Sequence, residues 1–148
     1  MLPGQTPARI LVVDDTSENR LVLKQLLIST GFEVEEASNG LEAVERFEAW
    51  HPALIFMDVR MPVMDGLEAT RRIRAIESRG GSPRCAILAL TAGAFEDERE
   101  EMLQCGADDF VAKPFRVATI FEKIGQYLNV RFRYEESDAA EVGSASRA

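Results

Sequence analysis

The stretch ALIFMDVRMPVMDG, at residues 53–66, carries the clearest information on the fold. Its first five residues, 53–57, are all apolar, which is typical of a strand buried on both faces of a sheet. Asp58 follows this strand directly, and after a short loop a helical pattern covers residues 67–78. A buried strand that leads into a helix is the repeating unit of a parallel sheet covered by helices.

The same unit recurs on both sides of this stretch. Strand patterns lie at 9–13, 32–37, 86–90 and 109–112, and helical patterns follow them at 17–30, 39–50, 95–104 and 116–129. Five strand-then-helix units in series predict an α/β domain: a doubly wound, five-stranded parallel sheet with five helices on its two faces. Such sheets bind ligands beyond the carboxyl ends of their strands.

Two of the expected helices have informative local patterns. The helix over 17–30 is inferred from apolar residues at roughly helical spacing, namely Leu21, Val22, Leu26 and Ile28. The next helix is predicted to begin at Asn39, because Glu42 follows three residues later and can complete a capping box.

Length and charge exclude several function classes. The 148 residues fit one domain, and 17 Lys and Arg against 25 Asp and Glu give a net charge of −8. An acidic balance argues against direct nucleic-acid binding and against adhesion to anionic membranes. No apolar run approaches the ~20 residues that cross a bilayer, and no signal peptide is visible. Cys85 and Cys105 stand outside any paired motif, so we expect reduced thiols and a cytoplasmic location.

Chemically distinctive residues follow four of the five strands. Asp14 and Asp15 follow strand 9–13, Asp58 follows the central strand, Thr91 the fourth and Lys113 the fifth. Because the carboxyl ends of parallel strands meet at one edge of a sheet, we expect these side chains to converge.

Three neighbouring carboxylates repel one another unless a cation neutralises them. Oxygen ligands without His or Cys favour a hard divalent ion, and a half-open site suits Mg²⁺. Lys113 and Thr91 are hydrogen-bond donors suited to phosphoryl oxygens, and Asp58 is a candidate nucleophile that can form an acyl phosphate. The set predicts a site that handles a phosphoryl group.

At this point the chain resembles the receiver domains of two-component response regulators, most closely those of hybrid sensor histidine kinases. The matching stretches are ILVVDDTSENRLVLKQLL, LIFMDVRMPVMDGLEATRRIR, ILALTA and GADDFVAKPF, in that order. The resemblance implies a flavodoxin-like (CheY-like) fold with strand order 2-1-3-4-5. It also implies a receiver domain at 9–129, which leaves an N-terminal linker at 1–8 and a C-terminal extension at 130–148. The small, polar composition of residues 135–148 predicts that this extension is largely a disordered tail.

The resemblance also implies roles at the site. Asp58 accepts a phosphoryl group from a phosphohistidine of a sensor histidine kinase or of a histidine phosphotransfer protein. Mg²⁺, for which Mn²⁺ can substitute, is held by Asp14, Asp15, Asp58 and the backbone carbonyl of Arg60. The Arg60 position also tunes the lifetime of the phosphoryl group.

Further residues would bind the phosphoryl group and respond to it. Thr91, Lys113 and the backbone of Ala92 match the phosphoryl-binding positions. Phe110 matches the switch aromatic, although it lacks the hydroxyl of the tyrosine that the family often has. Pro114 matches a proline that usually follows a cis bond.

The output would come from the face formed by the fourth helix, the fifth strand and the fifth helix (95–104, 109–112 and 116–129). The acidic helix 95–104 is interpreted as a solvated surface that selects partners. Through this face the domain would bind an output partner or associate with itself. The resemblance implies autocatalytic phosphorylation and dephosphorylation without an external substrate, in a free-standing regulator or in a segment of a hybrid histidine kinase.

Two other functions remain open from the residues alone. A phosphatase of the haloacid-dehalogenase type also uses an aspartyl nucleophile, but it requires D-x-D where this chain has Asp14-Asp15-Thr16. A flavodoxin-like flavin carrier needs a phosphate loop rich in Ser, Thr and Gly after the first strand. The acidic stretch DDTSEN at 14–19 is poorly suited to a flavin phosphate.

Overall fold

The computed structural model describes residues 8–80, 84–91, 96–113 and 115–128. The strands are β1 (Arg9–Val13), β2 (Glu33–Ala37), β3 (Leu54–Asp58), β4 (Ala86–Thr91) and β5 (Asp109–Ala112). The helices are α1 (Ser17–Ser29), α2 (Gly40–Trp50), α3 (Gly66–Gly80), α4 (Glu96–Cys105) and α5 (Val117–Leu128). The predicted element types and order are confirmed, and the boundaries of the elements differ by no more than two residues.

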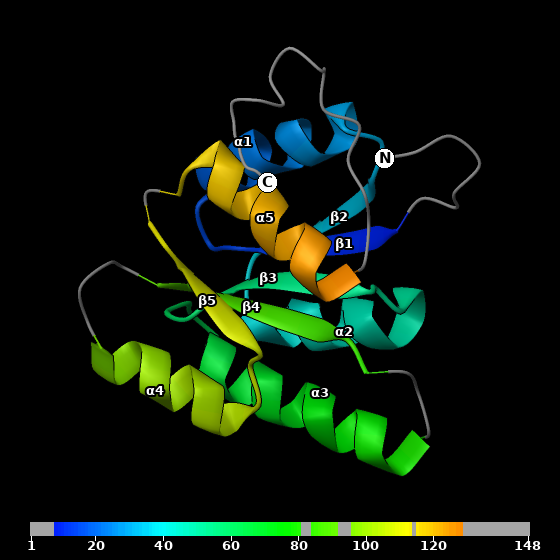
Figure 1. Cartoon of the computed structure of the whole chain (residues 1–148). Coiled ribbons are helices and arrows are strands. Elements are labelled where there is room, and N and C mark those ends of the chain that lie inside the picture. The colour runs from blue at the N-terminus through cyan, green and yellow to red at the C-terminus, as the bar shows by residue number, and fades with distance from the viewer. Residues whose placement is uncertain (1–7, 81–83, 92–95, 114, 129–148) are drawn as a thin grey trace.

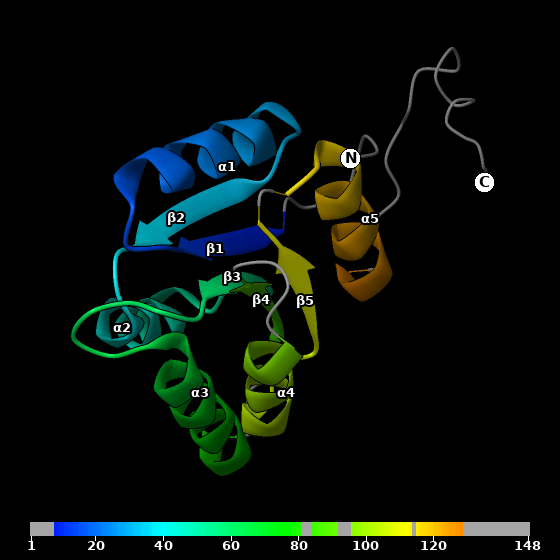
Figure 2. The same cartoon turned by 90° about the vertical axis from the view of Figure 1, so that its left-hand side faces the viewer.

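The five strands form one parallel sheet in the order β2-β1-β3-β4-β5, as predicted. Helices α1 and α5 cover one face of the sheet, and α2, α3 and α4 cover the other (Figures 1 and 2). The change in direction of strand order lies between β1 and β3, which pair with each other. This switch point is where a ligand site is expected in a doubly wound sheet.

The central strands are apolar because both of their faces are covered. Along β1, Ile10 and Val12 pack with α1 and α5, whereas Leu11 and Val13 pack with α2, α3 and α4. Successive side chains of a strand point to opposite faces, so each central strand feeds two separate cores.

The inward face of α1 is formed largely by residues other than those from which the helix was inferred, of which Leu26 is partly buried against the core. Leu23 and Leu27 are buried and pack against the sheet, whereas Leu21, Val22 and Ile28 are about half exposed. Residues four apart lie on one side of a helix, so Leu23 and Leu27 form the buried stripe and their apolar neighbours are turned toward solvent. Helix α1 therefore carries an apolar surface, which we call the α1 surface and define by Leu21, Val22 and Ile28.

Local contacts fix the start of α2 and the loop that follows β3. The side chain of Asn39 accepts a hydrogen bond from the Glu42 amide at 2.9 Å, so the predicted start of α2 is present. The amide of Gly40 donates to the Met64 carbonyl at 2.7 Å, which joins α2 to this loop. Gly66 packs so closely on the carbonyl of Asp58 that a Cβ atom there would overlap with it. The loop is thereby held against the carboxyl end of β3.

Several expectations concern residues outside the described ranges. The parts of the chain concerned are most of the N-terminal linker, the backbone of Ala92, the bond before Pro114 and the extension at 130–148. Within the part of the chain that the structure describes, no helix is both long enough and apolar enough to cross a membrane.

Candidate functional site

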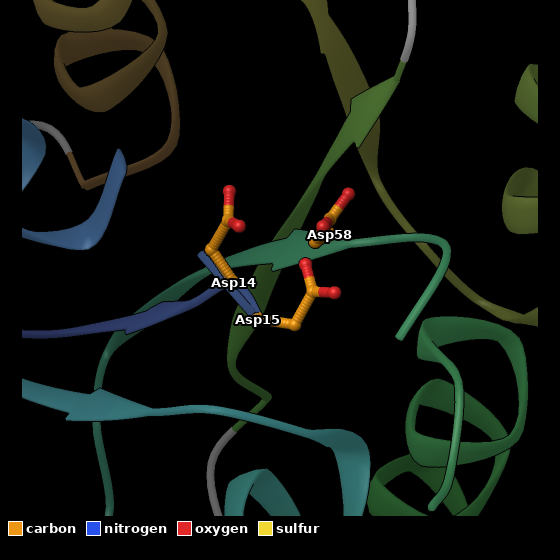
Figure 3. A group of neighbouring side chains, drawn as sticks. All are labelled: Asp14, Asp15 and Asp58. Carbon is orange, nitrogen blue, oxygen red and sulfur yellow. The ribbon is translucent and has the colours of Figure 1, made fainter. Parts of the chain in front are cut away.

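Three carboxylates gather at the carboxyl edge of the sheet. Asp14 and Asp15 follow β1, Asp58 ends β3, and an oxygen of each lies within 4.8 Å of the other two (Figure 3). Asp14 and Asp58 are buried, with 1 % and 8 % of their surface exposed, whereas Asp15 is exposed. The site is therefore a partly open acidic pocket whose floor is formed by two desolvated carboxylates.

The loop after β1 holds Asp14 in place. One carboxylate oxygen of Asp14 accepts a hydrogen bond from the Thr16 amide at 2.9 Å, and the other lies 3.4 Å from the Asn19 side-chain nitrogen. The Arg20 guanidinium donates to the backbone carbonyl of Asp14 at 2.6 Å and also pairs with Glu36 of β2. These supports were not predicted from the sequence, although Thr16, Asn19 and Arg20 follow Asp14 within six residues.

Lys113 brings a positive charge to the two buried carboxylates. Its ammonium group lies 3.0 Å from an oxygen of Asp14 and 3.3 Å from an oxygen of Asp58. Burial alone would lower the pKa of Lys113, but hydrogen bonds to the two carboxylates and their charges outweigh it, so the pKa is raised. The Lys113 amide donates to the Thr91 carbonyl at 2.8 Å, which fixes the end of β5 against the end of β4.

The pKa of Asp58 is raised from 3.8 to about 6. Burial is the main cause, and the charges of Asp14 and Asp15 act in the same direction, while Lys113 opposes them. A raised carboxyl pKa means that the negative charge of Asp58 is only partly compensated by the protein. Asp58 at neutral pH is thus an ionised, desolvated and nucleophilic carboxylate.

The donor set fits a magnesium ion. All the side-chain donors are carboxylate oxygens, and three negative charges face the single ammonium group of Lys113 among the described residues. A hard divalent cation prefers such oxygen ligands and offsets the remaining charge. The exposure of Asp15 leaves one side open for water and for a phosphoryl oxygen.

Thr91 contributes a buried hydroxyl group at the end of β4. The residue is fully buried, and its Oγ1 atom has no hydrogen-bond partner among the described residues. A buried hydroxyl without a partner costs roughly 1–3 kcal/mol relative to one that is hydrogen-bonded. A new acceptor close to Asp58 would therefore be an energetically favoured partner for Thr91.

Phe110 lies on β5 and is partly buried against the core. The guanidinium of Arg99 on α4 lies over its ring, 4.6 Å from the ring centroid. A cation over an aromatic face is attractive, so this contact joins α4 to β5. The ring of Phe110 therefore contacts α4 as well as the core, and the contact with α4 was not predicted from the sequence.

The acidic helix α4 is not wholly solvated, which corrects the prediction for this segment. Glu98 is only 4 % exposed, and its carboxylate pairs with the guanidinium of Arg60 in the loop after Asp58. The side chain of Arg60 thus joins the loop after β3 to α4. The partner of Glu98 lies 38 residues earlier in the chain, so the local pattern of α4 could not indicate it.

The structure brings Asp14, Asp15, Asp58, Thr91 and Lys113 to one edge of the sheet, from the ends of β1, β3, β4 and β5. The Arg60 side chain is directed to Glu98 instead of toward the carboxylates. The arrangement can bind a divalent cation and present a nucleophilic carboxylate to a phosphoryl donor.

Residues 10–125 match the family model of the response regulator receiver domain. The chain is 37% identical over 122 residues to the chemotaxis protein CheY of Bacillus subtilis (strain 168), covering 82% of this chain and 98% of CheY. It is also 35% identical over 128 residues to the hybrid signal transduction histidine kinase L of Dictyostelium discoideum, of which it spans only 8%.

Solved structures are similar in both fold and sequence. The receiver domain of the sensor histidine kinase PA1611 from Pseudomonas aeruginosa PAO1, which has a magnesium ion in its active-site cleft, is 35% identical with a TM-score of 0.75. The match covers 84% of this chain and 100% of that one.

The receiver domain of Ssk1, in a co-crystal structure with the histidine phosphotransfer protein Ypd1 of Saccharomyces cerevisiae, is 30% identical with a TM-score of 0.78. The shares covered are 82% and 88%. These matches support neither the phosphatase nor the flavin carrier.

Proposed function

This chain belongs to the response regulator receiver domains, and on that premise we propose that Asp58 is the residue that accepts the phosphoryl group. The observation that carries the proposal is the position of Asp58: buried at the end of β3, beside two further carboxylates and 3.3 Å from the Lys113 ammonium. Asp14 and Asp15 are less suitable, because Asp14 is buried among hydrogen-bond donors and Asp15 is exposed.

In the proposed reaction an oxygen of Asp58 attacks the phosphorus of a phosphohistidine. The new O–P bond forms as the N–P bond breaks, and the imidazole leaves with the electron pair of that bond. The attack needs the ionised form of Asp58, which predominates at pH 7 because the pKa is about 6. The ammonium group of Lys113 lies beside the attacking carboxylate and can donate hydrogen bonds to a phosphoryl oxygen.

Asp14, Asp15, Asp58 and the backbone carbonyl of Arg60 would hold Mg²⁺, and Mn²⁺ would substitute for it. When bound, the ion neutralises the charge that develops on the phosphoryl oxygens during transfer. The residues of this chain orient that site: Thr16 and Asn19 bond the Asp14 side chain. The oxygen-only donor set supports this assignment.

Phosphorylation would change the bonding of residues around Asp58. The added group carries roughly −1.5 to −2 charges and strong acceptor oxygens. Thr91, Lys113 and the backbone amide of Ala92 would bond these oxygens, and Phe110 would follow Thr91 inward. Bonds that exist in only one state shift an equilibrium toward that state. The consequence would appear on the face of α4, β5 and α5, where an output partner or a second copy binds.

The donor of the phosphoryl group would be a sensor histidine kinase or a histidine phosphotransfer protein. The co-crystal structure of Ypd1 with the Ssk1 receiver domain supports the second class. Helix α1 begins at Ser17, two residues after Asp15, and its α1 surface is apolar and exposed. We expect the phosphotransfer protein to cover this surface while its histidine reaches Asp58.

We propose a receiver domain at 9–129 between a linker at 1–8 and a disordered extension at 130–148. Its location would be cytoplasmic, and its chemistry would be confined to its own phosphorylation and dephosphorylation. The chain matches nearly all of CheY but only small parts of hybrid kinases, so both a free-standing regulator and a segment of a hybrid kinase are compatible with it.

Beryllofluoride with Mg²⁺ tests the assignment, because this complex imitates an aspartyl phosphate. In an amide NMR spectrum of the whole chain, we expect shifts at the ends of β1, β3, β4 and β5 and along the face of α4, β5 and α5. The Asp58→Asn variant should show none of these shifts. Shifts that persist in this variant would place the reactive carboxylate elsewhere.

A further inference from the structure

An ion pair joins the loop after β3 to α4, between two residues whose side chains have no role in the proposed reaction. The Nε atom of Arg60 donates to Oε2 of Glu98 on α4. The Arg60 side chain is 81 % exposed, whereas that of Glu98 is 5 % exposed. The pair therefore consists of a buried anion and a cation that reaches it from the solvent side.

The burial of Glu98 makes this contact specific. Removing a carboxylate from water is costly unless a cation or several donors compensate it. Arg60 is the cation that contacts Glu98, and the second oxygen of Glu98 has no hydrogen-bond partner among the described residues. Glu98 thus depends on Arg60 more than an exposed surface acid would.

Arg60 is also close to the phosphorylation site. It lies two residues after Asp58, a separation of at most about 7 Å along an extended chain. A guanidinium group forms paired hydrogen bonds with phosphoryl oxygens. A phosphoryl group on Asp58 would therefore compete with Glu98 for the same cation, and the strength of the Glu98 contact decides where the guanidinium resides.

We propose that Glu98 is a positioning residue that holds Arg60 on the α4 side of the site, and that it thereby shortens the lifetime of the phosphoryl group on Asp58. The inference rests on the proposed function of Asp58. Arg60 contacts the phosphoryl group only when its guanidinium has left Glu98. Glu98 in turn affects the phosphoryl group only through Arg60.

The affected step is hydrolysis of the aspartyl phosphate. A water oxygen attacks phosphorus as the O–P bond to Asp58 breaks, the carboxylate is regenerated with that electron pair, and inorganic phosphate leaves with the water proton distributed to solvent. The leaving oxygen belongs to the buried carboxylate of Asp58, so the attacking water must approach phosphorus from the opposite side, which faces solvent. A guanidinium bound to the phosphoryl oxygens on that side hinders this approach.

The test uses the full chain, loaded with radiolabelled acetyl phosphate and Mg²⁺ and then freed of the donor. The first-order loss of label is measured for wild type, Glu98→Gln, Arg60→Ala and the double variant. Asp97→Asn is the matched control, because Asp97 is a neighbouring acid of α4 that is exposed. A far-UV spectrum and a thermal melt confirm that each variant is folded.

Glu98→Gln should lengthen the half-life about 3- to 10-fold, the effect of one partly exposed ionic contact. Asp97→Asn should keep the wild-type half-life, and the double variant should match Arg60→Ala. An unchanged half-life in Glu98→Gln, or an equal effect of that substitution in the Arg60→Ala background, would overturn the positioning role. Absence of label from folded wild type would instead reject the proposed function itself.

Discussion

The ammonium group of Lys113 lies 3.3 Å from a carboxylate oxygen of Asp58. The same nitrogen lies 3.0 Å from Asp14, so one internal cation serves two of the three acids in the pocket. Lys113 partly neutralises the site, and it lies close enough to Asp58 to donate a hydrogen bond to a phosphoryl group carried by that carboxylate. In the proposed function, the ion pair would therefore couple metal binding, phosphorylation and the position of β5.

Removing the charge of Lys113 should strengthen metal binding and weaken the response to phosphorylation. In Lys113→Met we expect Mg²⁺ to bind about tenfold more tightly, because a positive charge next to the ligands no longer competes. Titration calorimetry measures the affinity. An equal or lower affinity in the folded variant would contradict this reading of the ion pair.

The raised pKa of Asp58 makes stability depend on pH. The folded protein holds the Asp58 proton up to about pH 6, whereas the unfolded chain loses it near 3.8. The folded state therefore binds more protons in this window, and the free energy of unfolding falls as pH rises through it. Asp58→Asn, measured without metal, should be about 2–3 kcal/mol more stable than wild type at pH 7 and nearly equal to it at pH 4.

Saturating Mg²⁺ provides the control for this comparison. It should raise the melting temperature of wild type more than that of Asp58→Asn, because the substitution removes one ligand charge. Parallel pH profiles for the two proteins, measured by denaturant unfolding, would rule out the account of the Asp58 pKa.

The buried hydroxyl of Thr91 should matter only after phosphorylation. Thr91→Val keeps the shape of the side chain and removes a hydroxyl that has no partner among the described residues. We expect the free energy of unfolding to be unchanged or up to about 1 kcal/mol higher. Beryllofluoride should still bind Asp58, but the amide shifts on α4 and β5 should be lost. Full shifts on α4 in this variant would show that Thr91 does not transmit the change.

Arg74 should be important for stability away from the site. Its guanidinium donates to the carbonyls of Cys85 and Gly106 and pairs with Glu77 and Asp108, which joins α3 to the beginnings of β4 and β5. Arg74→Met leaves two acids and two carbonyls without this partner, so we expect a loss of about 3–5 kcal/mol. Denaturant unfolding measures it. The exposed pair Arg72–Glu68 is the matched control, and Arg72→Met should cost less than about 1 kcal/mol.

The sheet and the position of the acidic pocket follow from the sequence because they depend on simple rules. Apolar strands such as 53–57 are buried on both faces, and residues that follow parallel strands share one edge. Asp14, Asp58 and Lys113 could therefore be placed together without knowing any side-chain contact.

The remaining features depend on tertiary contacts. Apolar residues of α1 occur on more than one side of the helix, so spacing alone did not reveal that Leu23 and Leu27 face the sheet while Leu21 and Val22 face solvent. Glu98 belongs to a segment that reads as solvated, and only the distant Arg60 makes its burial favourable. Hydrogen bonds from Asn19 and Arg20 to Asp14 likewise require the folded loop.

The most direct test of the central claim is the intact mass of the full chain after incubation with acetyl phosphate and Mg²⁺, compared with that of Asp58→Asn. The account predicts that wild type gains the mass of one phosphoryl group, that chelation of the metal prevents the gain, and that Asp58→Asn remains unmodified. A folded wild type that gains nothing, or an Asp58→Asn protein that gains the same mass, would contradict it.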